Sequence, residues 1–297
     1  MPRSKVRHAV FVLVQPGAVE FFDPVLPALR EQGWTVSVSD HFDPPVSDAG
    51  IVVTSTSYKA AERAGLKWAA QRGIPTVQLI DSWYDHRRRI EMTNGPGAMP
   101  NEIWVFDDVA MADAVSEGLP GERIRAVGHP AWDAVPPWPA AASAEILLID
   151  QPVSLDMGQR LGYTETEFFD LVRSGLGKNR PATLSMHPRR LESDPSAAGF
   201  RIVYNTREAA KSCGTVIGMF SSFLIEAFLA GRRVVSVQPK AKDEDFCILS
   251  RLGLVPRVTA AADLAPALAS AMPGPRGFER RFAGSRQRVL EAFATFA

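Results

Sequence analysis

Cysteine and long apolar runs are both scarce in this sequence. Its 297 residues contain only two cysteines, Cys213 and Cys247, and neither belongs to a Cys-x-x-Cys pair. This excludes a disulfide scaffold and a cysteine-rich zinc site, and it fits a reducing cytoplasm. No stretch approaches the ~20 apolar residues of a membrane span. The apolar run Ala9–Val14 is too short for a signal peptide, so we expect a soluble, cytoplasmic protein. A peripheral contact with the inner face of the membrane stays open.

An excess of charge of either sign is also missing. Lys and Arg together number 33, as do Asp and Glu, so the basic surface of a nucleic-acid-binding protein is not indicated. Several motifs of nucleotide and hydrolase chemistry are absent as well: there is no G-x-G-x-x-G, no P-loop, no H-E-x-x-H and no G-x-S-x-G. Local basic clusters can still bind the phosphates of a small ligand.

Short apolar runs alternate regularly with segments of helical spacing. Continuous β-branched runs indicate strands buried on both faces. We expect strands at Ala9–Val14, Thr35–Ser39, Ile51–Thr54, Pro75–Ile80, Ile103–Phe106 and Ile124–Val127, and later at Ile146–Asp150, Thr183–Met186, Arg201–Tyr204, Thr215–Gly218, Val234–Val237 and Val255–Val258. Helices are expected in most of the gaps, among them one over Ala18–Gln32. This alternation predicts an α/β fold of doubly wound parallel sheets.

A proline-rich stretch divides this pattern. Three prolines within four residues, Pro136, Pro137 and Pro139, are incompatible with a helix or a central strand. At about 150 residues per domain, the length also predicts two domains. We therefore expect an N-terminal Rossmann-like domain over 1–135, a linker over 136–144 and a C-terminal Rossmann-like domain over 145–297.

Ligands of open α/β sheets bind beyond the carboxyl ends of the strands, so the residues that follow each strand are candidates for a site. In the second half, Ser221 and Ser222 follow a strand and open a helix. Hydroxyls and backbone N–H groups at a helix start suit a phosphate, although either serine is also a common N-cap. Glu226 lies one turn further along, where its carboxylate could reach a ribose hydroxyl.

Two further loops of the second half follow strands. His187 can donate to a phosphate oxygen, Pro188 fixes the turn after it, and Arg189 adds positive charge. The loop Asp150-Gln151-Pro152 follows the first strand of this half, and we expect Gln151 to face the ligand.

In the first half, the segment Asp81–Arg89 follows a strand and combines two carboxylates, a histidine, two aromatics and three arginines. Aromatic faces suit sugar rings, and a carboxylate or imidazole can deprotonate a hydroxyl nucleophile. Asp81 is the first candidate for this base, ahead of Asp85 and His86. The alternative is a solvated loop with Trp83 packed inward.

Together these features resemble a compact glycosyltransferase of the GT-B fold, in which two Rossmann-like domains face each other across a cleft. The resemblance covers nearly the whole chain and is strongest over Pro100–Asp133 and Gly218–Pro239. The His-Pro at 187–188 and the Ser-Ser at 221–222 are similar to motifs of bacterial sialyltransferases and capsule Kdo transferases, which use CMP-sugar donors. In those enzymes the histidine and the serine hydroxyls contact the nucleotide phosphate. The Asp-Gln-Pro at 150–152 is similar to the Kdo enzymes, whereas the Asp/Glu-Asp/Glu-Gly motif that carries the sialyltransferase base has no counterpart here.

The resemblance implies a metal-independent glycosyltransferase of cell-surface polysaccharide synthesis, without a bound cofactor. The C-terminal domain would hold the nucleotide sugar, with a CMP-sugar favoured over a UDP-sugar. The N-terminal domain would hold the base and a glycan or lipid-linked acceptor. Asp243-Glu244-Asp245 has the spacing of a metal-bound nucleotide-sugar motif, but we interpret it as a solvent-facing loop. The sequence carries no signal for an oligomeric state.

Three alternatives stay open. A nucleotide-sugar 2-epimerase or hydrolase uses the same fold at small size and consumes its donor without an acceptor. A CDP-polyol phosphotransferase shares the His-Pro and Ser-Ser features. A non-catalytic nucleotide-sugar-binding protein on the same scaffold would bind the donor without turnover.

Overall fold

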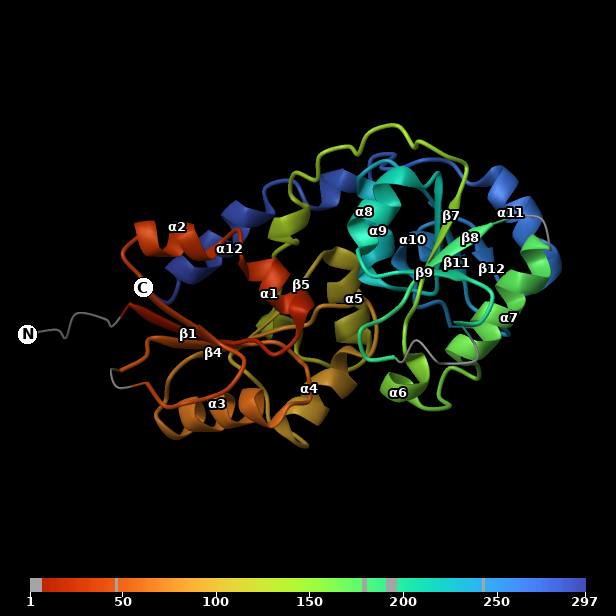
Figure 1. Ribbon diagram of the computed structural model, residues 1–297. Helices are drawn as coiled ribbons and strands as arrows, with labels where there is room; N and C mark the ends of the chain where they lie inside the picture. Colours follow the sequence, from red (N-terminus) through yellow and green to blue (C-terminus); the bar gives the residue numbers. More distant parts are fainter. Residues whose placement is uncertain (1–6, 46–47, 178–180, 191–196, 242–243) are drawn as a thin grey trace, which may run out of the picture. The chain divides into compact units, whose positions relative to one another are not determined.

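The computed structural model describes residues 7–45, 48–177, 181–190, 197–241 and 244–297. These residues form two six-stranded sheets, each within its own compact unit (Figure 1). The first unit comprises Met1–Ala134 together with Glu279–Ala297, and the second comprises Val135–Phe278. The predicted α/β class with two Rossmann-like parallel sheets is confirmed. No helix among the described residues combines the length and the apolar character that crossing a membrane demands.

The sheet of the first unit has the strand order β2-β1-β3-β4-β5-β6. Every neighbouring pair is parallel, and β1, β3 and β4 are buried along their whole length, as their apolar runs predict. The strand order reverses between β1 and β3, so the loops after these two strands diverge. The strands are β1 (His8–Val12), β2 (Thr35–Ser39), β3 (Ile51–Thr54), β4 (Thr76–Leu79), β5 (Glu102–Val105) and β6 (Ile124–Ala126).

Helices cover both faces of this sheet. Figure 1 shows α1, α2 and α12 on one face and α3 and α4 on the other. The bounds are α1 (Pro16–Phe22), α2 (Leu26–Glu31), α3 (Ala60–Gln71), α4 (His86–Asn94), α5 (Asp108–Ser116) and α12 (Ser285–Ala294).

Two helices of the first unit differ from the sequence-based prediction. The prediction of a single helix over Ala18–Gln32 was wrong, because the chain forms α1 and α2 with a break between them. Pro24 lies in that break. Proline has no backbone N–H for a helical hydrogen bond, and its ring would clash with the preceding turn of a continuous helix. Helix α4 was not predicted, because its sequence is dominated by charged residues and carries little apolar periodicity.

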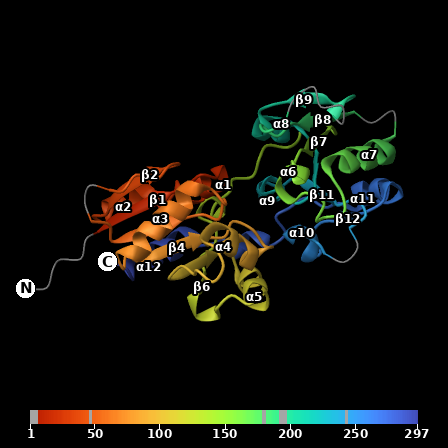
Figure 2. The same cartoon turned by 90° about the horizontal axis from the view of Figure 1, so that it is seen from below.

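The sheet of the second unit has the order β12-β11-β10-β7-β8-β9, again with every neighbouring pair parallel. Its order reverses between β7 and β10. The strands are β7 (Ile146–Ile149), β8 (Ala182–Ser185), β9 (Arg201–Val203), β10 (Thr215–Gly218), β11 (Arg233–Val237) and β12 (Arg257–Val258). Figures 1 and 2 show α8 and α9 on one side of this sheet and α7 and α11 on the other. The helices are α6 (Val153–Met157), α7 (Glu165–Leu176), α8 (Thr206–Ser212), α9 (Ser222–Leu229), α10 (Ile248–Arg251) and α11 (Leu264–Ser270).

The last 19 residues belong to the first unit rather than to the second. Phe293 of α12 packs against Phe11, Trp34 and Trp104, with ring centroids 5.7, 5.9 and 5.2 Å apart. The prediction had ended the C-terminal domain at residue 297. Apolar spacing shows that this segment is helical, but it does not show which sheet the helix covers.

A tight backbone contact joins this C-terminal segment to the loop after β6. Gly128 has φ +80°, and a Cβ at this position would lie 1.9 Å from the Ser285 hydroxyl oxygen. That hydroxyl accepts a hydrogen bond from the backbone N–H of His129 (3.0 Å) and donates to the carbonyl of Phe282. Only glycine allows the chain to pass so close to Ser285 in this conformation.

Beside this contact, the His129 ring lies inside an aromatic cluster. It stacks on Trp132 with centroids 3.7 Å apart, and Phe21 and Phe106 each lie 5.1 Å away. Burial lowers the pKa of His129 to about 3, because the ring is shielded from the water that would stabilise its charged form. The histidine is therefore a neutral core residue, which agrees with a structural role for the segment Gly128–Asp133.

Replacing Gly128 by alanine is expected to destabilise the first unit by about 3 kcal/mol or more, because strain at positive φ adds to the clash with Ser285. The measurement is urea unfolding followed by tryptophan fluorescence. The matched control is Gly33→Ala, since Gly33 also has positive φ (+84°) but has no atom near its missing Cβ. We expect the control to lose about 1–2 kcal/mol. Equal losses in the two variants would contradict the clash.

The buried His129 should also make stability depend on pH. In the unfolded chain the imidazole of His129 binds a proton near pH 6.5, whereas in the folded protein it does so only near pH 3. The contribution of His129 to the unfolding free energy is therefore full above pH ~6.5 and is lost as the pH falls from ~6.5 towards 3. The expected loss approaches 1.4 kcal/mol per pH unit at most. Urea unfolding of the parent and of His129→Phe at pH 7, 6 and 5 should show a shallower dependence in the variant. An unchanged dependence would contradict this assignment.

Candidate functional site

The loops after β7 and β10 meet at the point where the strand order of the second unit reverses, which is where ligands of open α/β sheets bind. Gln151, directly after Asp150, accepts a hydrogen bond from the backbone N–H of Phe220 through its Oε1 (2.8 Å). On the other side, the Ser236 hydroxyl donates to the carbonyl of Met219 (2.6 Å). The turn between β10 and α9 is thus held from both sides by side chains.

This turn presents the two predicted serines. Ser221 is the N-cap of α9, and its Oγ accepts from the backbone N–H of Phe223 (3.3 Å). A capping hydroxyl accepts through a lone pair and keeps its own hydrogen, so Ser221 can still donate to a ligand oxygen. Ser222 is exposed at the first position of the helix. Both interpretations of Ser221, cap and ligand contact, are compatible with this geometry.

His187 lies at the carboxyl end of β8, the strand on the other side of β7. Its Nδ1 accepts a hydrogen bond from the backbone N–H of Arg189 (3.2 Å). Partial burial, together with the positive charge of Arg189, lowers the pKa of His187, so the ring is neutral near pH 7. Because Nδ1 is the acceptor, the proton of the neutral ring is on Nε2, which makes Nε2–H a donor for an anion.

A buried ion pair holds the His187 loop. The carboxylate of Asp150 accepts from the backbone N–H of His187 (3.0 Å) and from Arg190 Nη1 (3.2 Å), and both side chains are almost fully buried. Arg190 also lies 3.5 Å from the carboxylate of Glu165, which in turn accepts from the backbone and hydroxyl of Ser154. Arg190 follows Arg189 in the sequence, but its buried ion pairs give it a structural role.

The other predicted ligand contacts of the second unit have partners within the protein. Arg189 forms a bidentate ion pair with Asp156 of α6 (2.8 and 2.7 Å), which raises the pKa of Arg189. Glu226 forms a bidentate pair with Arg207 of α8 (2.5 and 2.9 Å). Pro188 is exposed in the turn after His187. The structure therefore brings Gln151, the two serines and His187 to neighbouring strand ends, with Arg189 and Glu226 engaged in salt bridges.

In the first unit, Asp81 lies two residues beyond the end of β4 and pairs with Arg89 of α4 (Oδ1 to Nη1, 3.2 Å). The Arg89 guanidinium lies 5.0 Å from the centre of the Tyr84 ring. Burial acts to lower the pKa of Arg89, but Tyr84 and the carboxylate of Asp81 outweigh it and raise that pKa. The backbone of Gly17 is also near, since a Cβ there would lie 3.5 Å from Asp81 Oδ2. These residues form a fixed carboxylate–guanidinium pair beside an aromatic ring.

Two residues around this pair have a strained backbone. Asp85 has φ 60° and Tyr58 has φ 64°, both in the left-handed region that side chains with a Cβ rarely adopt. Such conformations are concentrated at functional sites. Tyr58 was not predicted, although it follows β3, the neighbouring strand of β4, and inspecting every strand end would have found it.

The loop between β3 and Tyr58 is anchored by a buried carboxylate, Glu62 of α3. Glu62 accepts hydrogen bonds from the Ser55 hydroxyl and from the backbone N–H of Ser57 (2.8 Å). Burial raises the pKa of Glu62, and these donors oppose the rise. The buried carboxylate of Glu62 therefore holds this loop in place and does not face a ligand.

The structure does not bring His86 together with Asp81 as a catalytic pair. The His86 ring is fully buried, and its Nδ1 lies 2.7 Å from Glu117 Oε1 at the end of α5. Trp83 is packed inward and donates to Asp107 (2.9 Å), as the alternative interpretation of this segment expected. The segment thus divides into a buried part, Trp83 and His86, and the cluster of Asp81, Tyr84, Asp85 and Arg89.

The acidic triplet 243–245 lies partly outside the described residues, which begin again at Glu244. Asp245 accepts from Gln238 Nε2 (2.6 Å), from the backbone N–H of Cys247 (2.9 Å) and from the Ser250 hydroxyl (2.7 Å). Its carboxylate thus fixes the start of α10. Within the described ranges, no group of three or more His, Cys, Asp and Glu side chains could hold a metal ion.

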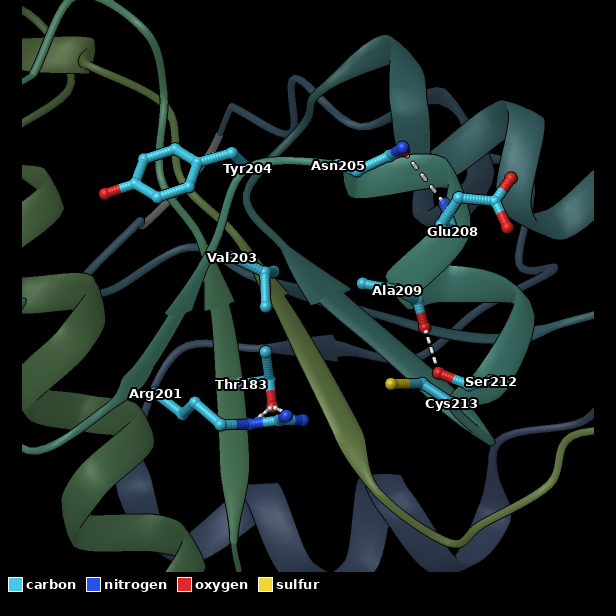
Figure 3. Close-up of a pocket in the computed structure, with 9 residues that line it drawn as sticks. All are labelled: Thr183, Arg201, Val203, Tyr204, Asn205, Glu208, Ala209, Ser212 and Cys213. Atoms are coloured by element: carbon cyan, nitrogen blue, oxygen red, sulfur yellow. Dashed lines mark hydrogen bonds between the residues drawn. The ribbon is translucent and has the colours of Figure 1, made fainter.

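A cavity of about 370 Å³ lies elsewhere in the second unit, between the edge strand β9 and α8 (Figure 3). Arg201 borders it and donates to the Thr183 hydroxyl, and the buried Cys213 also lines it. Asn205 caps α8 by accepting from the backbone N–H of Glu208 (3.2 Å). None of the predicted site residues lines this cavity.

The sequence matches no family model, and no curated protein is similar to it. Solved structures match over nearly the whole chain. One is UDP-GlcNAc 2-epimerase from Methanocaldococcus jannaschii in complex with UDP-GlcNAc and UDP (TM-score 0.63, 12% identity, covering 98% of this chain and 99% of that one). Another is UDP-GlcNAc 2-epimerase from Neisseria meningitidis bound to UDP-GlcNAc (0.64, 9%, 97% and 99%), and a third is the glycotransferase of kitacinnamycin (0.50, 13%, 99% and 96%). At these identities the similarity establishes the fold: the chain has a GT-B-like fold.

The two aspartate–arginine pairs near His187 should differ sharply in their effect on stability. Asp150→Ala removes one of the two carboxylates that neutralise the buried Arg190 and leaves only Glu165. We therefore expect a loss of about 3–5 kcal/mol in the unfolding free energy of the second unit. Asp156→Ala removes the exposed partner of Arg189 and should cost less than about 1 kcal/mol. Urea denaturation of the two variants and the parent protein measures both values. Similar losses would show that the buried pair does not hold the loop.

Proposed function

We propose that this chain is an enzyme that binds a nucleotide sugar through the second unit. The observation that carries the proposal is the set of donors at the ends of the two strands that flank β7: Nε2–H of His187 after β8, and the hydroxyls of Ser221 and Ser222 after β10. These groups donate hydrogen bonds and suit a phosphate or diphosphate. Gln151 supports them because it holds the turn that carries the serines.

UDP is the first candidate for the nucleotide. The epimerases from Methanocaldococcus jannaschii and Neisseria meningitidis were both solved with UDP-GlcNAc, and each covers this chain almost completely. The CMP-sugar expected from the two-residue motifs has no such support, so CMP becomes the second candidate. A phosphate site built from hydroxyls and one imidazole does not itself distinguish the bases.

For the reaction, we propose acid–base chemistry on the sugar of the bound donor, of the 2-epimerase or hydrolase type, ahead of glycosyl transfer. The similar epimerases favour it over the motif-based expectation of a transferase. Asp81 is the candidate base in the first unit, and Arg89 positions its carboxylate. Glycosyl transfer to a hydroxyl acceptor is the second candidate, supported by the similar glycotransferase of kitacinnamycin.

Nucleotide binding can be tested by thermal unfolding of the purified protein with UDP, CMP, CDP, GDP and TDP. A ligand at 100 times its Kd adds about 2.7 kcal/mol to the unfolding free energy, and we expect UDP to give the largest increase in Tm. His187→Ala should weaken UDP binding about 10- to 100-fold, the equivalent of one hydrogen bond to a charged group. His41→Ala, an exposed histidine of the first unit, is the matched control. Stabilisation by CMP alone would restore the CMP-sugar assignment, and no response to any nucleotide would contradict the proposal.

The reaction can then be followed by NMR with UDP-GlcNAc and no acceptor. Appearance of the C2 epimer or release of UDP would support the first candidate, whereas turnover only after acceptor addition would support transfer. Asp81→Asn should lower turnover by 100-fold or more while UDP affinity is unchanged. Binding without turnover under all conditions would indicate a nucleotide-sugar-binding protein.

A further inference from the structure

Strand β2 forms one edge of the first sheet, and within the described residues its outer side has no partner strand (Figure 2). Its five residues, Thr-Val-Ser-Val-Ser, include no charged side chain and no proline. Thr35, Ser37 and Val38 are exposed, and 42% of the Val38 surface is accessible to solvent. An exposed edge of this length and composition favours pairing with another strand.

The other edge strands of the two sheets are protected against such pairing. Strands β6 and β9 have three residues each and β12 has two, and each of the three contains an arginine: Arg125, Arg201 or Arg257. Short length and a charged side chain are common means of preventing edge-to-edge association. Among the described strands, β2 is therefore the edge that lacks both.

The backbone of β2 presents a regular set of hydrogen-bonding groups at this edge. The N–H of Thr35 and the carbonyl of Ser39 both form hydrogen bonds towards the chain of β1 (2.8 Å each). Because the hydrogen-bonding direction alternates from residue to residue along a strand, Ser37 also bonds towards β1. The N–H and C=O groups of Val36 and Val38 therefore point outward, away from β1.

This edge is complementary to a second copy of itself. If two β2 strands pair antiparallel and are centred on Ser37, Val36 of each copy lies opposite Val38 of the other, and the outward groups of these residues exchange both hydrogen bonds. In the same register, valine meets valine on one face of the sheet, whereas Thr35 meets Ser39 on the other face. A twofold interface requires this kind of self-complementarity.

The charges at the two ends of β2 favour the antiparallel direction. Arg7 lies beside the start of the strand, where its guanidinium donates to the carbonyl of Gln32 (3.1 Å). Beyond the end of the strand, the exposed carboxylates of Asp40 and Asp43 lie on either side of His41 (2.9 and 3.3 Å). Antiparallel pairing places the basic end of each strand beside the acidic end of the other, whereas parallel pairing would bring like charges together.

We propose that β2 is the interface of a homodimer, in which the β2 strands of two copies of this chain pair antiparallel about a twofold axis at Ser37. The sheets of the two first units then form one continuous sheet. The outward backbone groups of Val36 and Val38 gain partners, and the valine side chains of the two copies pack together. A second copy fits this edge better than an unrelated peptide, because the side-chain pattern and the end charges both match themselves.

Disulfide trapping tests the register. At Ser37 the antiparallel pair would be of the non-hydrogen-bonded type, with Cα atoms about 4.5 Å apart, so Ser37→Cys should form a cross-link under mild oxidation. Thr35→Cys is the matched control, because it is exposed on the same face of β2 but its two copies would lie ~13 Å apart. The parent, whose Cys213 and Cys247 are buried, gives the background.

A covalent dimer on a non-reducing gel is expected for Ser37→Cys alone. Equal cross-linking of Ser37→Cys and Thr35→Cys, or no cross-linking of Ser37→Cys, would overturn the proposal.

Sedimentation velocity of the full chain tests the hydrogen bonds. We expect the parent to form dimers as its concentration is raised. Val38→Pro removes an N–H that faces away from β1, so the first unit should still fold but the dimer should be lost. Val38→Thr keeps this N–H and a side chain of similar shape, and it should dimerise as the parent does. Circular dichroism of each variant confirms that it is folded. A parent that is monomeric at every concentration, or a dimer that survives Val38→Pro, would contradict this interface.

Discussion

Parallel pairing of the strands is the constraint on which the rest of this structure depends. Because all strands of a parallel sheet run the same way, their carboxyl ends share one edge, and residues far apart in the sequence meet there. In both units the strand order reverses beside the first strand, between β1 and β3 and between β7 and β10. Gln151 and Ser221 are 70 positions apart in sequence, yet the turn before Ser221 is bound by Gln151 because β7 and β10 are neighbours.

Both units hold these edge loops in the same physical way. A buried carboxylate accepts a backbone N–H from a loop at the sheet edge: Glu62 from Ser57 in the first unit, and Asp150 from His187 in the second. Hydrogen bonds to a charged acceptor are stronger than neutral ones, and burial excludes competing water. Glu62 and Asp150 therefore fix the backbone of these loops, while side chains of the loops, such as that of His187, are available for a ligand.

The candidate residues differ in how strongly the protein already engages them. His187 and the serines keep donor groups after their internal hydrogen bonds are satisfied, because an imidazole and a hydroxyl can each accept and donate at once. Arg189 and Glu226 instead use both ends of their planar groups in bidentate pairs. A ligand would have to compete with those pairs, which makes the imidazole and the hydroxyls the better phosphate partners.

The sequence by itself determined the α/β class, the twelve strands found in the described residues and the loops worth inspecting, because buried parallel strands are continuous apolar runs and their ends are local features. The sequence also contains the reason for the break between α1 and α2, which is Pro24. The prediction of one helix over Ala18–Gln32 did not take this proline into account. Only the tertiary structure decided that α12 covers the first sheet, that His86 is buried against Glu117, and that Arg190 rather than Arg189 pairs with Asp150. Those outcomes depend on which side chains meet across long sequence separations, and neither spacing nor residue type records that.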